Sequence, residues 1–169
     1  MSQPACRKWR ILLEFSCIVI IALPSWQGGK HYLRGWHGPA GSLTNDLFIP
    51  AIMMNAGEGF CNVDPNSIPG MRAFLDFQSD SFEVHQVPSE VETTVLHPYQ
   101  EFHRYLIYTV AATWRLWGIT WDSIKLLLLA YLFLSCLAIY GICRLGMNPL
   151  LALAAALVFI FTPAVYTTL

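Results

Sequence analysis

Asp46 is the side chain whose type and place in the sequence best suit acid–base chemistry. It ends the polar segment Ser42-Leu43-Thr44-Asn45-Asp46, which offers several helix N-caps and precedes an apolar stretch. A carboxylate in a partly dry pocket can take a proton from a hydroxyl group, because desolvation raises carboxylate pKa values toward the working pH. Asp46 is therefore a general-base candidate. An exposed helix cap is the alternative, and the sequence leaves it open.

Arg104 and Arg115 are the cations best placed to bind a phosphate group. Both lie on the more polar line of a helix that the residue spacing predicts over residues 99–117. A guanidinium group can form two parallel hydrogen bonds to a phosphate and can stabilise charge that develops on a leaving phosphate. The alternatives are contact with lipid headgroups, or pairing of Arg104 with Glu101 three residues earlier.

The histidines and cysteines do not form a metal-binding or disulfide pattern. His97, Glu101 and His103 are close in sequence, but residues 97 and 103 do not share a helix face, and Pro98 begins the helix after His97. Cys61 is the only cysteine in the polar part of the chain, so no disulfide framework can form there. We predict no cofactor, and the sequence does not support a divalent-metal site.

The distribution of charge predicts the elements that must hold these residues. The chain has 169 residues, of which 55% are hydrophobic and 12% are charged, against about 25% charged in a typical soluble domain. This composition excludes a disordered chain, and a net charge of -1 without a basic stripe argues against nucleic-acid binding. Ten acids and six bases lie within residues 27–125, whereas residues 126–169 carry only Arg144. This segregation predicts a mainly α, polytopic membrane protein with one large hydrophilic loop.

Three apolar runs are predicted to cross the membrane as helices, at residues 9–26, 122–143 and 149–169. Basic residues precede the first run, which places residues 1–8 in the cytoplasm. The loop over residues 27–121 is then extracytoplasmic, and residues 144–148 form a short cytoplasmic turn. The predicted localisation is an integral, multi-pass membrane protein.

The first run has a second interpretation, because a signal peptide shares its basic start and apolar core. The segment Ala22-Leu23-Pro24-Ser25-Trp26 lacks a clean small-x-small cleavage pattern, so we favour an uncleaved span. Glu14 lies inside this run but close to its cytoplasmic end, where its carboxylate can reach the headgroups.

The third run carries a packing signal and an unusual end. Ala152 and Ala156 form a small-xxx-small face suited to close helix packing. Pro163 lies near the predicted outer end, and the chain stops at Leu169 without a polar tail. We expect the chain to be the N-terminal piece of a longer protein. A genuine three-span protein is the alternative.

Two juxtamembrane helices are predicted in the loop, at about residues 45–56 and 99–117. In the first, Pro50 requires either a 3₁₀-like first turn or a start near Ile49, and Gly57 ends the helix. The second is amphipathic and should lie in the membrane interface, with three tryptophans in the headgroup layer: Trp114, Trp117 and Trp121. Its predicted apolar line is Tyr99, Phe102, Leu106, Val110, Thr113 and Trp117.

The order of these features resembles the N-terminal part of the C-type (GT-C) membrane glycosyltransferases, which include the protein O-mannosyltransferase-like and aminoarabinose-transferase-like families. The similar residues cover about half of the chain and begin with Asn45-Asp46-Leu47-Phe48-Ile49-Pro50-Ala51 and Ala56-Gly57-Glu58-Gly59-Phe60. They continue with His97-Pro98-Tyr99 to Trp117-Gly118-Ile119, then Arg144-Leu145-Gly146 and Phe161-Thr162-Pro163. Many members have an Asp-Glu pair where this sequence has Asn45-Asp46.

The resemblance implies an enzyme that moves a hexose or pentose from a polyprenyl-phosphate carrier to an acceptor on the outer face of the membrane. It implies Asp46 as the general base and Arg104 and Arg115 as ligands of the lipid phosphate. The implied partners are membrane lipid and the polyprenyl-phosphate-linked sugar donor. This family has many more spans, so we expect the present chain alone to be inactive.

Two other functional classes compete with this reading. One is a non-catalytic three-span membrane protein whose outer loop binds a partner. The other is a transporter subunit, although such proteins more often carry polar or broken helices at mid-membrane. The enzyme reading predicts that the complete protein fails without Asp46. The binding-protein reading predicts that Asp46 can be replaced without loss of function.

Overall fold

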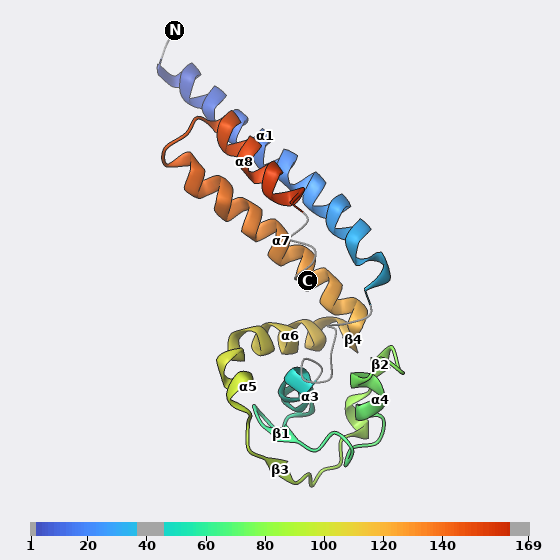
Figure 1. Cartoon of the computed structure of the whole chain (residues 1–169). Coiled ribbons are helices and arrows are strands. Elements are labelled where there is room, and N and C mark those ends of the chain that lie inside the picture. Colours follow the sequence, from blue (N-terminus) through green and yellow to red (C-terminus); the bar gives the residue numbers. More distant parts are fainter. Residues whose placement is uncertain (1–2, 37–45, 163–169) are drawn as a thin grey trace. The chain divides into compact units, whose positions relative to one another are not determined.

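The chain folds into two compact units. The computed structural model describes residues 3–36 and 46–162, with side chains from residue 8 onward. The helical unit comprises Met1–Gly35 and Leu128–Leu169, and the loop unit comprises Trp36–Leu127. Helices dominate the described residues, and the strands are short (Figure 1).

The helical unit is built from long apolar helices. It contains α1 (Gln3–Tyr32), a 3₁₀ turn η1 (Leu33–Gly35), most of α7 (Trp121–Arg144), and α8 (Pro149–Ile160). In Figure 1, α1, α7 and α8 lie side by side with their axes roughly aligned. The chain reverses direction between α7 and α8, as the short turn in the sequence predicts.

Two helices are long and apolar enough to cross a membrane by length and composition, Lys8–Gly35 and Trp121–Arg144. Many of their apolar side chains face outward, and Phe15 is 65% exposed and Leu134 56% exposed. The core helix of a soluble protein buries side chains of this kind, whereas hydrocarbon is a favourable solvent for them. Their exposure therefore favours association with a membrane.

Helix α1 is longer than the span predicted at residues 9–26 and continues through Pro24 to Tyr32. Proline lacks a backbone N–H, which removes one hydrogen bond from the helix. In the same turn, Ser25 Oγ donates to the Ile21 carbonyl oxygen at 2.8 Å and adds a local bond. The carbonyl that loses its donor at Pro24 is that of Ile20, so the Ser25 bond adds to this turn without replacing the lost one.

Small residues allow the helices of this unit to approach closely. Ala152 and Ala156 are fully buried, which confirms the predicted packing face of the last apolar run. A Cβ atom on Gly29 of α1 would lie 2.3 Å from Leu129 Cδ2 of α7, so the helices are in close contact there. The buried cluster consists of Cys17, Ile21, Leu132, Cys136, Tyr140, Ala152, Leu153, Ala156 and Ile160.

Helix α8 is the described part of the third predicted span. It begins with an N-cap, because Asn148 Oδ1 accepts a hydrogen bond from the Leu151 N–H at 3.0 Å and Pro149 follows. Its 12 residues extend about 18 Å, against about 30 Å for a hydrocarbon core. Within the described ranges, the spanning length is therefore met by α1 and α7 only. The remainder of the predicted span, with Pro163, lies outside the described residues.

The loop unit consists of short helices joined by two small sheets. Its helical elements are η2 (Asp46–Phe48), α3 (Ile49–Ala56), α4 (Met71–Leu75), η3 (Val84–Gln86), α5 (Pro98–Phe102) and α6 (Arg104–Trp117). Its strands are β1 (Asn62–Val63), β2 (Ser81–Phe82), β3 (Thr93–Thr94) and β4 (Ile119–Thr120).

Both sheets join segments that are distant in sequence. Strand β1 pairs antiparallel with β3 through Asn62↔Thr94 and Val63↔Thr93. Strand β2 pairs antiparallel with β4 through Ser81↔Thr120 and Phe82↔Ile119. The first pairing joins two segments in the middle of the loop, and the second ties the middle of the loop to the segment that precedes α7.

The core of the loop unit is an aromatic cluster around Trp121. The Trp121 ring stacks on Phe74 with centroids 4.9 Å apart, and the Trp114 and Phe48 rings contact it edge-on. The indole N–H groups are satisfied, because Trp114 Nε1 donates to the Thr120 carbonyl and Trp121 Nε1 donates to the Phe74 carbonyl, each at 3.0 Å. The prediction that all three tryptophans lie in the headgroup layer is therefore wrong for Trp114 and Trp121. Trp117 remains 57% exposed.

The helix predicted over residues 99–117 is divided at His103, which separates α5 from α6. The division changes the helical register, so the predicted apolar line does not form one face. Phe102 is 83% exposed, whereas Ile107 and Trp114, which were outside the line, are buried. The buried face of α6 packs against α3, and Asn55 Nδ2 donates to the Ala111 carbonyl at 3.1 Å.

The start of the helix predicted at about residues 45–56 agrees with the constraint set by Pro50. Residues Asp46–Phe48 form a 3₁₀ turn, and the α-helix proper begins at Ile49, where a proline is tolerated in the first turn. Gly57 ends the helix in the left-handed conformation with φ 92°. Asp46 is therefore the first residue of a 3₁₀ turn that leads directly into α3.

Candidate functional site

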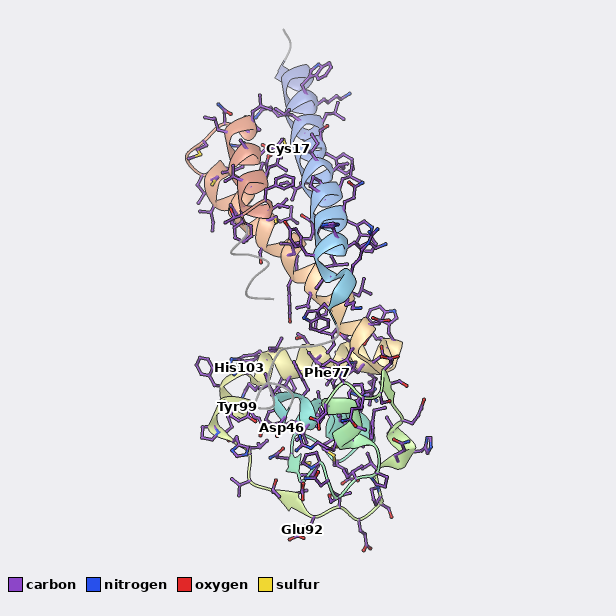
Figure 2. All side chains as sticks on the ribbon, turned by 45° about the vertical axis from the view of Figure 1, so that its right-hand side comes forward. Cys17, Asp46, Phe77, Glu92, Tyr99 and His103 are labelled. Carbon is purple, nitrogen blue, oxygen red and sulfur yellow. The ribbon has the colours of Figure 1, made fainter. Side chains whose placement is uncertain are left out.

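Asp46 begins η2 and is fixed by the residues that follow it. Leu47 and Phe48 are both 6% exposed and anchor the turn in the core of the loop unit. The Asp46 side chain itself remains 30% exposed. Asp46 and the neighbouring Tyr99 are labelled in Figure 2. The carboxylate is thus held by a rigid backbone at a partly solvated position.

Arg72 of α4 is the ionic partner of Asp46. Its Nη1 lies 3.1 Å from Asp46 Oδ1 and 3.6 Å from Asp76 Oδ1, and its side chain is 33% exposed. Within the described part of the chain, Asp46 Oδ2 receives no hydrogen bond. One carboxylate oxygen is therefore oriented by the guanidinium group, and no described residue donates to the other.

A buried amide supports the backbone beneath this pair. Gln100 is fully buried, and its Nε2 donates to the Asp46 carbonyl oxygen at 2.9 Å and to Asn62 Oδ1 at 3.2 Å. Its Oε1 accepts from the His97 N–H at 2.9 Å, which closes the N-terminus of α5. The network connects η2, β1 and α5, so the position of Asp46 depends on three segments that are distant in sequence.

Tyr99 lies close enough to Asp46 for the carboxylate charge to act on its phenol group. Burial raises the pKa of Tyr99 above the usual value, and the charge of Asp46 raises it further. The phenol therefore stays protonated at neutral pH, as a hydroxyl group that can donate a hydrogen bond.

The two arginines predicted to bind phosphate occupy different surroundings. Both are exposed on α6. Arg115 lines a pocket of about 460 Å³, and Arg104 is not among its lining residues. Glu101 and Arg104 do not form an ion pair within the residues that the structure describes. Asp46 is also outside this pocket, so the pocket does not join the predicted catalytic and phosphate-binding residues.

The described residues do not contain a group of three or more histidine, cysteine, aspartate or glutamate side chains that could hold a metal ion. His97 precedes α5 as its N-cap residue, and His103 forms the break before α6. His103 Nδ1 lies 2.8 Å from the Tyr99 carbonyl oxygen, where its N–H can donate. These histidines therefore have local backbone contacts.

An ionic cluster in the helical unit was missed at the sequence level. Arg144 Nη2 and Nε lie 2.6 Å and 3.0 Å from Glu14 Oε1, and the Tyr140 hydroxyl donates to Glu14 Oε2. Arg144 also donates to the Met147 carbonyl at 2.6 Å. The signal was present in the sequence, since Glu14 is the only acid before Asp46 and Arg144 the only charged residue after Lys125. Opposite charges isolated in apolar helices are expected to pair.

Three regions of the chain thus hold charged side chains in a defined arrangement: the Asp46–Arg72 pair, the pocket beside Arg115, and the Glu14–Arg144 cluster. The first two belong to the loop unit, and the third belongs to the helical unit. Comparisons of the chain with models of protein families, with curated proteins and with solved structures gave no match.

Proposed function

We propose that this chain supplies the N-terminal portion of an integral membrane glycosyltransferase, in which Asp46 is the general base. The enzyme moves a sugar from a polyprenyl-phosphate carrier to an acceptor hydroxyl group on the outer face of the membrane. The observation that carries the proposal is the Asp46–Arg72 pair, because it fixes one oxygen of a partly exposed carboxylate and leaves the other unoccupied by described residues.

The proposed step is a substitution at the anomeric carbon of the sugar. The acceptor oxygen forms the new bond to this carbon as the bond to the phosphate oxygen breaks. The acceptor proton passes to Asp46, and the bonding electrons leave with the lipid phosphate. Arg72 acts as a positioning residue, and Arg104 stabilises the departing phosphate.

Features outside the pair support the proposal. Two helices able to cross a membrane flank the loop unit in sequence, which keeps it tethered near a lipid-linked donor. The buried Gln100 fixes the Asp46 carbonyl oxygen, and a fixed carboxylate transfers protons more efficiently than a mobile one.

The test is an assay of sugar transfer in membranes that contain the complete gene product, with a panel of radiolabelled polyprenyl-phosphate hexoses and pentoses as donors. Asp46→Asn is expected to lower the rate by at least about 100-fold. Asp76→Asn is the matched control, because Asp76 contacts the same arginine at 3.6 Å and should retain most of the activity. Equal rates for wild type and Asp46→Asn would overturn the assignment of Asp46.

A partner-binding loop is the second candidate function. It is favoured by large apolar side chains on the surface of the loop unit, since Val95, Phe102 and Tyr105 are 89%, 83% and 78% exposed. In this case no sugar is transferred from any donor in the panel. Replacement of Phe102 and Tyr105 with serine would instead weaken the co-purification of a partner that wild type and Asp46→Asn both retain.

A further inference from the structure

We propose that the pocket beside Arg115 binds a small organic ligand that carries a single oxyanion group, either a carboxylate or a phosphodiester. The pocket lies within the loop unit and has a volume of about 460 Å³, within the usual range of about 300–1,000 Å³ for small-molecule sites. This inference does not depend on the proposed sugar transfer, because it concerns a site that Asp46 does not line and it is tested by binding alone.

The walls of the pocket come from segments that the fold brings together. Asn55 of α3 and Trp114 and Arg115 of α6 line it. The paired strands β2 and β4 and the start of η3 also line it, at Ser81–His85 and Gly118–Thr120. The antiparallel pairing Phe82↔Ile119 holds these segments in register, so the pocket is a product of the folded loop unit.

Arg115 supplies the charge that selects an anion. The ion pairs among the described residues involve Arg72, Lys125 and Arg144 as cations, and none of them involves Arg115. A guanidinium group without an acidic partner can form two parallel hydrogen bonds to a carboxylate or phosphate. His85 and Ser81 line the same pocket and provide further N–H and O–H groups.

Glu83 limits how much negative charge the ligand can carry. It lines the pocket together with Arg115, and the repulsion from its carboxylate grows with the negative charge of the ligand. A phosphate monoester or polyphosphate is therefore disfavoured relative to a monoanion. The apolar side chains Phe82, Trp114 and Ile119 suit a hydrophobic or ring-shaped portion of the ligand.

Gly118 lines the pocket at the end of α6. Its φ of 86° and ψ of 156° turn the chain from the helix into β4, a conformation that side chains other than glycine rarely adopt. A Cβ atom at this position would meet no described atom within 4 Å. The glycine is therefore required by the backbone conformation rather than by contact with a neighbouring side chain.

The experiment measures binding by calorimetry to the full chain purified in a neutral detergent. Benzoate and diphenyl phosphate are the monoanionic probes, phenyl phosphate is the more highly charged probe, and benzyl alcohol is the neutral control. We expect the monoanions to bind and benzyl alcohol to bind at least about tenfold more weakly. Arg115→Gln should weaken the monoanions about tenfold or more, and Glu83→Gln should strengthen phenyl phosphate most.

The matched control is Lys125→Gln, which removes a positive charge from the loop unit outside the pocket and should leave the affinity unchanged. Nanodiscs of phosphatidylcholine with and without phosphatidylglycerol distinguish a lipid source of the phosphodiester from a soluble one. A loss of affinity that depends on phosphatidylglycerol and occurs only in Arg115→Gln indicates that a lipid headgroup binds in the pocket. Equal losses in Lys125→Gln and Arg115→Gln, or no binding of either monoanion by a folded wild-type chain, would overturn the proposal. Asp46→Asn should bind normally, so failure of the proposed enzyme leaves this test intact.

Discussion

The helical unit and the loop unit bury their side chains in different ways. In the helical unit, fully buried alanines and a glycine bring the helices together, and many large apolar side chains face outward. In the loop unit, large aromatic rings fill the interior, and buried polar groups are satisfied by specific partners such as the Gln100 amide. The first pattern suits a protein surrounded by lipid, where small residues promote packing. The second suits a small domain in water, where aromatic burial supplies most of the stability.

The units also differ in how they use charge. The helical unit pairs its isolated acid, Glu14, with its isolated base, Arg144. The loop unit places Arg72 between two carboxylates and leaves Arg115 unpaired among the described residues. An ion pair with both partners satisfied is structural, whereas an unpaired cation beside a pocket is free to bind a ligand. The loop unit is therefore the part of the chain in which we place function.

The strongest test of this comparison removes the aromatic core of the loop unit. Trp114 is 1% exposed, so Trp114→Ala should destabilise the loop unit by about 3–5 kcal/mol. Hydrogen exchange in detergent should show faster exchange in α3 and α6 and unchanged exchange in α1 and α8. Trp117→Ala is the control, because Trp117 is largely exposed and its loss should have little effect. Similar exchange in both variants would contradict an aromatic core centred on Trp114.

A smaller effect is expected when the close packing of the helical unit is disturbed. Ala156→Leu adds three carbon atoms at a fully buried position and should cost about 1–3 kcal/mol. Ala154→Leu makes the same change at an exposed position of α8 and should be tolerated. Thermal unfolding followed by the helical circular dichroism signal distinguishes the two. Equal midpoints would contradict packing through the small-residue face.

The smallest effect concerns Tyr99 and depends on pH. Its pKa is raised in the folded chain by burial and by Asp46, so the folded state holds the proton more tightly than the unfolded state. The resulting stabilisation is complete below the unfolded pKa of about 10 and is lost as the pH rises through the folded pKa. The free energy of unfolding is measured with denaturant at pH values from roughly two units below to one unit above that pKa, between about pH 8 and 11. Over this range it should decline less in Tyr99→Phe than in wild type. In Asp46→Asn the phenol should titrate at a lower pH than in wild type, because one cause of the shift is removed. An identical titration would contradict the electrostatic contact.

The coarse plan of the chain follows from its sequence. Runs of apolar residues determine the helices able to cross a membrane, because each backbone group must be satisfied within the helix wherever water is absent. Pro50 and Gly57 determine how the first short helix begins and ends, since both act on the local backbone. The small-residue face at Ala152 and Ala156 is likewise a local property of one helix.

The tertiary structure decided the environment of the residues that carry chemistry. Nothing near Asp46 in sequence identifies Arg72 as its partner or Gln100 as its support, because these contacts join segments 26 and 54 residues apart. Contacts between distant segments also produce three other features. These are the burial of Trp114 and Trp121, the division of the helix at His103, and the pocket beside Arg115. Local patterns record the period and composition of an element. Which of its faces is buried, and which charge meets which, depends on long-range packing that no single stretch of the sequence encodes.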